Sequence, residues 1–477
     1  MSAAIAAGNP HTARAAADIL RAGGNAVDAA IAAGLASFVS EPLLSSAGGA
    51  GMMLISTAAE DAVVDFFSAF PGQGGVIEAS ARDFVPLEID FGSATQVFHV
   101  GRASAAPPMA LSGLAEASRR FGSLPLRDLI GPACELAQHG APVSPESAEV
   151  FRLLWPINQL SAATMAAYSH NDLPPAPGSR HPMPRMVDVL EAFAEAGGMP
   201  EALNAAILEE FGVEQGGCLT RADLVAPIPV VTPRRFSLGD WTVLTSPRIG
   251  GELVRVITEA LIASTSDSPA IRARQVAEAC RLGHRAKTSD SIVGSTTHIS
   301  VVDDQGTAVS MTLTNGEGCG YLVPGTPIQL NNFLGEEDLN PEGFFRYPPG
   351  TPLPSAIAPT IARSADGLLA LGSGGANRIR SVVSQVLHRV AIEGERLEPA
   401  IYAPRVHAEE ESVWLEMADR ALPSETLHAL HESFRAVYEF PTRAFFFGGV
   451  HAVLQRHGET TAVGDPRRGG ATFNVDE

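Results

Sequence analysis

A β-hairpin is predicted by residues 294–314, which read GSTTHISVVDDQGTAVSMTLT. Residues 297–302 alternate in side-chain character and are rich in β-branched residues, which is typical of a strand. The next residues, 303–306, predict a tight turn, and residues 308–314 predict the returning strand. The strand that begins near Thr296 is therefore expected to pair with the strand that ends at Thr314.

Two small residues, Gly294 and Ser295, come directly before Thr296 at the start of this hairpin. A threonine that opens a strand is common in proteins, so this pattern alone indicates no chemistry. His298 is a lone histidine in the same strand, and a structural hydrogen bond is the simpler interpretation for it. None of the 13 histidines forms a pair with the spacing of a metal site.

A glycine cluster lies further along, in residues 371–379, which read LGSGGANRI. It follows an apolar strand and precedes a predicted helix. Successive N–H groups of such a turn can converge on an anion or on a developing oxyanion. Taken alone, a plain strand–helix turn is the simpler interpretation of the same residues.

The rest of the chain predicts helices mainly in its first half and strands mainly in its second half. No internal repeat interrupts this order, which suggests layers of helix on sheet. The predicted helices occupy residues 12–22, 25–35, most of 107–140, most of 145–212, 252–264 and 272–287, and the further strands occupy residues 52–56, 62–67, 359–362, 368–372 and 450–455.

The composition excludes several classes of protein. The chain has 477 residues, of which 45% are hydrophobic, enough for a sizeable core. Its 33 basic and 53 acidic residues give a formal charge of −20, which argues against nucleic acid or an anionic membrane as partner. The sequence contains no G-x-S-x-G, H-E-x-x-H or P-loop motif.

The cysteines and the N-terminus bear on the compartment. The four cysteines are too dispersed for a C-x-x-C site or a disulfide scaffold, and we expect free thiols at Cys134, Cys218, Cys280 and Cys319. The first residues show no basic segment followed by a long apolar run, so no signal peptide is expected. A cytoplasmic protein is the expectation.

Taken together, these segments resemble the gamma-glutamyltransferase family of N-terminal-nucleophile hydrolases over nearly the whole chain. The hairpin segment matches the processing-site signature of that family closely. Further matches occur in the family's order, at residues 8–11 and 17–30, at 41–42 and 48–51, at 121–133 and 219–224, at 331–332 and 359–360, and at 464–470.

The resemblance implies a self-processing enzyme that needs no metal or organic cofactor. The chain would cut itself between Ser295 and Thr296, and Thr296 would then serve as nucleophile. The new α-amino group, with a pKa near about 7.7–8.0, would act as its base. Thr314 falls at the position of a second, assisting threonine, and Gly374 and Gly375 would supply the oxyanion N–H groups.

The chain departs from the family pattern where the glutamyl group would bind. The family's arginine for the substrate carboxylate is replaced by Phe67, and one of its paired serines is kept as Ser355. The aspartate for the substrate amine is at best replaced by Glu336. Asn315 comes one position earlier than the family's asparagine, and Phe333, which follows the Asn-Asn pair, would add apolar surface together with Phe67 and Phe70. These changes predict a less polar acyl group than γ-glutamyl. The alternative is that another cation, for instance Arg346 or Arg378, replaces the missing arginine.

The resemblance also implies a four-layer αββα sandwich, within the α+β class. We expect a large piece, residues 1–295, and a small piece, residues 296–477, interleaved in one unit. The expected partners are a small amide substrate and water or an amine acceptor, with the oligomeric state left open. Two alternatives are a catalytically silent relative that acts as a binding protein and an ordinary serine hydrolase, and the latter lacks its motif.

Overall fold

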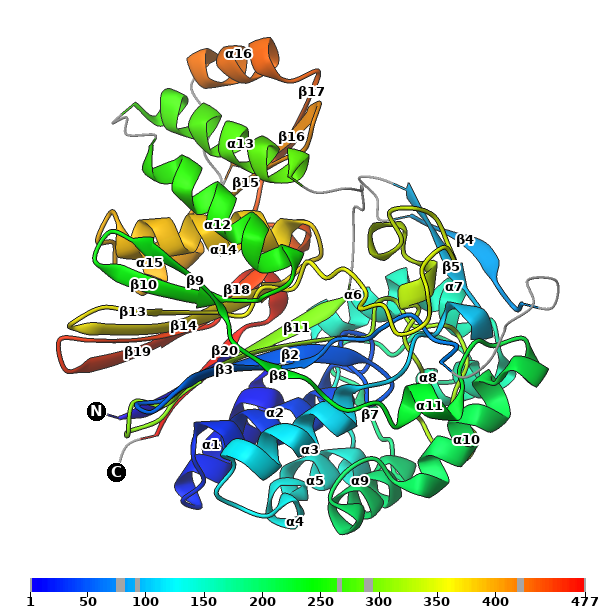
Figure 1. Ribbon diagram of the computed structural model, residues 1–477. Helices are drawn as coiled ribbons and strands as arrows, with labels where there is room; N and C mark the ends of the chain where they lie inside the picture. The colour runs from blue at the N-terminus through cyan, green and yellow to red at the C-terminus, as the bar shows by residue number, and fades with distance from the viewer. Residues whose placement is uncertain are drawn as a thin grey trace.

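Two antiparallel sheets lie face to face between layers of helices in the computed structural model, which describes residues 2–73, 82–90, 95–263, 268–286, 295–417 and 424–475 (Figure 1). Each sheet has one face on the other sheet and one face under helices. The four-layer αββα sandwich predicted from the sequence is therefore confirmed.

The first sheet carries the predicted hairpin at its centre. Strands β11 and β12 pair antiparallel, with Thr296 directly opposite Thr314. In spatial order the strands are β20 (Ala471–Val475), β1 (Ala3–Ala7), β11 (Thr296–Val302), β12 (Ala308–Thr314), β2 (Ala50–Ser56), β3 (Asp61–Phe66) and β8 (Val230–Val231).

The second sheet lies against the hairpin and ends in the glycine cluster. Strand β14 runs at its centre, and Gly374 is its last residue. In spatial order the strands are β19 (Glu459–Val463), β18 (Gly449–Arg456), β14 (Gly367–Gly374), β13 (Thr360–Arg363), β10 (Trp241–Thr245) and β9 (Arg234–Leu238).

Helices rich in alanine cover the first sheet. All 15 residues of α2 (Ala26–Ser40) are buried, because its small side chains allow neighbours to approach closely. At Gly34 a β-carbon would lie 2.9 Å from the Met311 Cε atom of β12. The other helices of this half are α1 (Pro10–Arg21), α3 (Ala110–Phe121), α4 (Leu126–Leu129), α5 (Gly131–His139), α6 (Pro145–Leu153), α7 (Trp155–Asn158), α8 (Ala162–Tyr168), α9 (Arg185–Ala196), α10 (Glu201–Phe211) and α11 (Arg221–Leu224).

The second sheet is covered by α12 (Ile249–Ile262), α14 (Arg378–Ala391) and α15 (Leu397–Tyr402) (Figure 1). A smaller unit with its own core projects beyond them. It consists of α13 (Pro269–Arg285), α16 (Ser424–Ser433) and the strands β15 (Val406–Ala408), β16 (Ser412–Glu416) and β17 (Ala436–Phe440).

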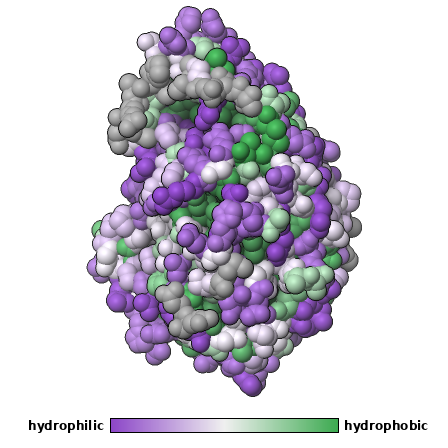
Figure 2. All heavy atoms as spheres, turned by 90° about the vertical axis from the view of Figure 1, so that its left-hand side faces the viewer, coloured by the Kyte–Doolittle hydropathy of each residue, from purple (hydrophilic) through white to green (hydrophobic). Residues whose placement is uncertain are grey.

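The side of the molecule seen in Figure 2 is largely hydrophilic, with apolar side chains gathered below the projecting unit. Among the residues that the structure describes, no helix combines the length and the apolar character needed to cross a bilayer. All four cysteines are free thiols, as expected. Two small antiparallel pairs, β4 (Val85–Asp90) with β5 (Thr95–Val100) and β6 (Ala141–Pro142) with β7 (Arg180–His181), complete the strands outside the main sheets.

Candidate active site

Three oxygen atoms at the start of β11 form a continuous hydrogen-bonded chain. The Thr296 hydroxyl donates to the Thr314 hydroxyl over 3.2 Å, and the Thr314 hydroxyl donates to the Ser295 carbonyl over 2.7 Å. The Gly316 N–H also donates to the Thr314 hydroxyl, over 3.2 Å. Because Thr296 and Thr314 are cross-strand partners, the hairpin register itself creates this arrangement.

The next residue, Thr297, points to a different partner. Its hydroxyl donates to Glu41 Oε2 over 2.6 Å, and the Thr12 hydroxyl donates to Glu41 Oε1 over 2.7 Å. Glu41 caps the end of α2, and burial raises the pKa of its carboxyl. Thr297 therefore fixes β11 to the helices beneath it.

His298 has the structural role that the sequence favoured. Its Nδ1 atom lies 2.9 Å from the Thr312 hydroxyl, and its Nε2 atom lies 3.0 Å from the Ser300 hydroxyl. The ring is fully buried between the sheets, and burial lowers its pKa well below the ordinary value. Both ring nitrogens are thus engaged away from the Thr296 hydroxyl, so the ring is not placed to act as its base.

The glycine turn after β14 lies against the nucleophile candidate. A β-carbon added at Gly374 would lie 2.1 Å from the Thr296 carbonyl oxygen, so only glycine allows this approach. Gly375 has a φ of +116°, and Ala376 has a φ of +47°, before α14 begins at Arg378. The turn is thus wound tightly at the residues expected to supply oxyanion N–H groups.

A buried acidic residue that the sequence did not single out, Glu317, completes this side of the site. Its N–H donates to Asn332 Oδ1 over 2.8 Å. Burial and the nearby Asp338 carboxylate raise the pKa of Glu317, while the Asn332 side chain and the Ser295 amide offset part of this effect. Its only sequence signal is its place three residues after Thr314.

Two further residues predicted from the sequence, Glu336 and Asn315, lie next to Gly316, the residue before Glu317. A β-carbon at Gly316 would lie 2.2 Å from Glu336 Oε1, so the Glu336 side chain closes over that glycine. Asn315 is turned toward a different neighbour, because its side-chain amide donates to the Gln329 carbonyl over 3.4 Å.

Aromatic rings pack together at Phe67 and Phe333, two residues that the sequence predicts to lie in the acyl site. The Phe67 and Phe333 rings stack with centroids 5.1 Å apart, and both residues are buried. A second pair, Phe70 and Tyr347, stacks at 4.5 Å. Ser355 is buried as well, and its hydroxyl accepts from the Ile357 N–H over 3.3 Å.

An arginine distant in sequence lies beside Phe67, but its polar atoms are engaged within the protein. Arg248 Nε donates to Asp65 Oδ2 over 2.8 Å, and Nη2 donates to the Phe67 carbonyl over 3.1 Å. The third nitrogen, Nη1, donates to the Leu353 carbonyl. No sequence pattern links Arg248 to Phe67, because 181 residues separate them.

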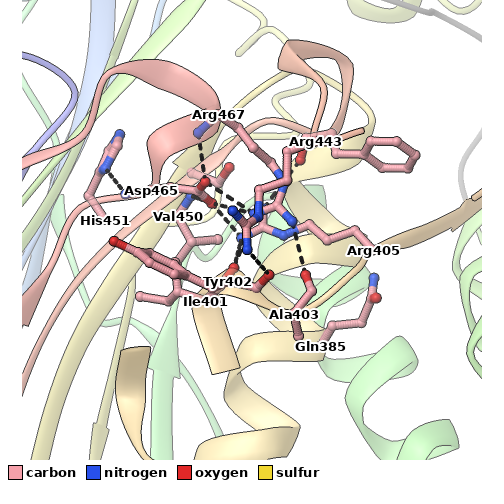
Figure 3. A network of polar contacts seen from close by, with 12 residues as sticks. Gln385, Ile401, Tyr402, Ala403, Arg405, Arg443, Val450, His451, Asp465 and Arg467 are labelled. Carbon is pink, nitrogen blue, oxygen red and sulfur yellow. Dashed lines mark hydrogen bonds and ion pairs between the residues drawn. The ribbon is translucent and has the colours of Figure 1, made fainter. Parts of the chain in front are cut away.

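The segment 464–470 forms a buried ion-pair network, shown in Figure 3. Asp465 accepts from Arg405 Nη2 over 2.5 Å and from the Val450 N–H over 3.1 Å. Arg467 pairs with both Asp465 and Glu416. The network joins β18, α15 and β16, so Asp465 and Arg467 have a structural function.

Known proteins match the chain over nearly its full length. The gamma-glutamyltranspeptidase family matches residues 12–278 and 257–475. The acylase ACY 1 proenzyme of Pseudomonas sp. (strain SE83) is 28% identical over 94% of this chain and 89% of its own length. The glutathione hydrolase proenzyme of Bacillus subtilis (strain 168) is 24% identical over 99% of this chain and 91% of its own.

The fold also has a close counterpart among solved structures. The cephalosporin acylase from Bacillus halodurans superimposes with a TM-score of 0.81 at 21% sequence identity, covering 99% of this chain and 95% of that one. Because the family match covers most of the chain, this chain belongs to the gamma-glutamyltranspeptidase family of N-terminal-nucleophile amide hydrolases and acyltransferases.

Proposed function

We propose that this chain is a proenzyme that cleaves itself between Ser295 and Thr296 and then hydrolyses or transfers an apolar acyl group from an amide. The observation that carries the proposal is the hydrogen-bonded chain from the Thr296 hydroxyl through Thr314 to the Ser295 carbonyl. The match to relatives named proenzymes supports it.

The self-cleavage step follows from this geometry. The Thr296 hydroxyl oxygen attacks the Ser295 carbonyl carbon, and the proton of that hydroxyl is transferred to the departing Thr296 nitrogen. The Thr314 hydroxyl, which donates to the Ser295 carbonyl oxygen, stabilises the negative charge that develops there. The C–N bond breaks and an ester forms, and water hydrolyses that ester to leave residues 1–295 and 296–477.

The amidase reaction then uses the new N-terminus. The neutral α-amino group of Thr296 accepts the proton of its own hydroxyl, and the hydroxyl oxygen attacks the substrate carbonyl. The N–H groups of the turn at Gly374 and Gly375 stabilise the tetrahedral intermediate. The amine product leaves, and water or a second amine takes the acyl group from Thr296.

The acyl preference is argued from the rings around Phe67. A carboxylate placed beside Phe67 and Phe333 would lose its hydration without gaining a cation, because Arg248 is engaged by Asp65 and two carbonyls. Hydrogen bonds to charged groups contribute about 1.5–3 kcal/mol each, which is roughly 10–200-fold in rate. An apolar acyl chain would instead gain contact with the rings.

Self-cleavage is tested by intact mass. The purified wild-type protein should yield a fragment that begins at Thr296, and Thr296→Ala should remain one chain. Thr314→Val should slow cleavage by about 10–100-fold, because it removes a hydrogen bond to a buried oxygen, whereas Thr314→Ser should retain it. A wild-type chain that stays intact after long incubation would exclude both the processing and the enzymatic proposals.

The acyl group is tested by paired kinetics. Aliphatic or phenylacetyl p-nitroanilides should be cleaved with a higher kcat/KM than γ-glutamyl-p-nitroanilide by the self-cleaved protein. Phe67→Arg should reduce the difference in kcat/KM between the apolar and the γ-glutamyl substrates, because it supplies a cation for the substrate carboxylate. Phe70→Leu serves as a control for the change in side-chain size. If the γ-glutamyl compound is the faster substrate of the wild-type enzyme, the apolar assignment is wrong and the amidase assignment stands.

A further inference from the structure

A buried arginine, Arg468, lies directly behind the glycine turn of the active site. Its Nη1 atom lies 3.4 Å from the position of a β-carbon at Gly374, and its Nη2 atom lies 3.4 Å from that at Gly375. The same Gly374 position is 2.1 Å from the Thr296 carbonyl oxygen. Arg468 is only 5% exposed, at the end of the short helical turn η7 (Pro466–Arg468).

No carboxylate among the described residues forms an ion pair with this guanidinium. Its Nε and Nη1 atoms are buried without a hydrogen-bond partner in the described part of the chain, and Nη2 reaches the Phe445 carbonyl at 3.5 Å. The guanidinium carbon lies 3.8 Å from the centre of the Phe445 ring. The charge is therefore held by stacking and is not neutralised by contact.

The preceding residue, Arg467, has the charged partners that Arg468 lacks within the described ranges. Arg467 is equally buried, but it pairs with Glu416 and Asp465, and those contacts raise its pKa. Burial, together with the Arg378 guanidinium, lowers the pKa of Arg468 to about 9, so it is still charged at neutral pH. An unpaired buried cation is costly for stability. The position of Arg468 against the glycine turn suggests that its buried charge serves the active site.

We infer that Arg468 is an electrostatic positioning residue for the amidase proposed above. Its charge favours the negatively charged tetrahedral intermediate at the Gly374–Gly375 turn and favours the neutral, proton-accepting form of the Thr296 amine. It acts through space and through the turn, without touching the substrate. The effect is large because the medium between them is protein and not water.

The other charged groups around this point do not cancel the charge. Glu41 and Asp465 are the acids that face Arg468, and they are bound by two threonine hydroxyls and by two arginines, respectively. Burial raises the pKa of Glu41. Among the basic residues, Arg378 is a second cation that faces Arg468.

Two further groups near the site are close to neutral. Burial lowers the pKa of His451, in β18, to about 4, so that ring is neutral at pH 7. The pKa of Glu317, beside Ser295, is raised by burial and Asp338. The Glu409 carboxylate, which accepts from the Asn377 amide over 3.4 Å, offsets the Arg378 charge. Arg468 remains the cation at the turn with which no described carboxylate forms an ion pair, and a positive charge lowers the pKa of a neighbouring amine.

The test compares Arg468→Met with Arg468→Lys in the self-cleaved enzyme, using the best p-nitroanilide substrate. For Arg468→Met we expect kcat to fall about tenfold or more, with KM within about twofold, and the ascending limb of the kcat/KM profile to move up by about one pH unit. Arg468→Lys should keep the limb near the wild-type position. The control is Arg456→Met, which removes an arginine stacked on Trp241 at the far end of β18.

Self-cleavage and turnover are measured first in the wild-type protein, where they test the proposed function alone. A failure of the proposed function is therefore distinguished from a failure of the role inferred for Arg468. If Arg468→Met does not cleave itself, residues 292–295 are replaced by a protease recognition sequence in wild type and variant alike, and Thr296 is released by the protease. An unshifted pH limb in Arg468→Met, or equal shifts in the Met and Lys variants, would overturn the electrostatic role.

Discussion

The Thr314 hydroxyl contacts three groups, and each contact has a chemical use. It accepts from Thr296, accepts from the Gly316 N–H and donates to the Ser295 carbonyl. A single hydroxyl can do this because it has one donor and two acceptor positions. The hydroxyl therefore links the proposed nucleophile and the proposed scissile carbonyl without a histidine, and His298 has a structural function.

At the residue scale, Glu317→Gln should stabilise the protein more at pH 7.5 than at pH 5. The folded-state pKa of Glu317 is raised, so the folded chain keeps the proton that the unfolded chain loses above its ordinary pKa. Stability from this group is complete at low pH and is lost as pH rises, by up to about 1.4 kcal/mol per pH unit. Gln has the shape of the protonated Glu317 side chain but does not titrate, so the loss of stability at higher pH disappears.

The measurement is the free energy of unfolding of Thr296→Ala and of Thr296→Ala with Glu317→Gln, so that both remain single chains. Adding Asp338→Asn should reduce the pH-dependent part of the difference, because Asp338 is the carboxylate that helps to raise this pKa. If the two proteins differ in free energy of unfolding by the same amount at pH 5 and at pH 7.5, the raised pKa of Glu317 is contradicted.

Residues inside the linear motifs could be located from the sequence, and residues defined only by the fold could not. Thr296, Thr314 and Gly374 lie in or next to elements with clear turn and strand patterns, and the structure brings them together. Arg468 lies in the matched segment 464–470, but its approach to the glycine turn is a contact across the chain, and Arg248 lies in no matched segment. Burial and long-range contacts leave no local pattern, so these two contacts could not be predicted from the sequence.

At the element scale, strand β1 shows where sequence patterns fail. Residues 3–7 read AAIAA, and alanine favours helices, yet this segment is a fully buried strand between β20 and β11. Pairing on both edges overrides the local preference. The hairpin of β11 and β12, with its β-branched residues and tight turn, was predicted correctly over its whole length.

The β14–α14 turn yields a prediction about two neighbouring small residues. Gly374→Ala places a methyl group 2.1 Å from the Thr296 carbonyl oxygen, so the strands must separate. We expect self-cleavage to slow about 100-fold, since displacements near 1 Å in a reacting geometry have effects of that size. The rate is measured from the loss of intact chain over time.

The matched variant is Ala376→Gly. Ala376 has a φ of +47°, where an L-residue is strained, and glycine should stabilise the fold by about 1 kcal/mol. Its self-cleavage should stay near the wild-type rate, because no atom is added toward Thr296. Equal slowing in both variants would show that the flexibility of the turn, and not its contact with Thr296, controls the reaction.

At the scale of the whole molecule, both sheets are built from both sides of the proposed cleavage point. In the first sheet β1 lies between β20 and β11, and β12 pairs with β2. In the second sheet β13, from the later part of the chain, pairs with β10 from the earlier part. Neither part has a complete sheet of its own, so cutting one peptide bond leaves these pairings intact.

We therefore expect pieces 1–295 and 296–477 to co-elute in size-exclusion chromatography and to separate only in denaturant. Separation would expose the edges of β1, β2 and β10 together with the apolar faces beneath them, which is costly. After denaturation, recovery of the cleaved protein should depend on protein concentration, because two chains must meet. Thr296→Ala, a single chain with the same contacts, should refold independently of concentration. Pieces that separate in native buffer at micromolar concentration would mean that the shared sheets are less stable than their pairing indicates.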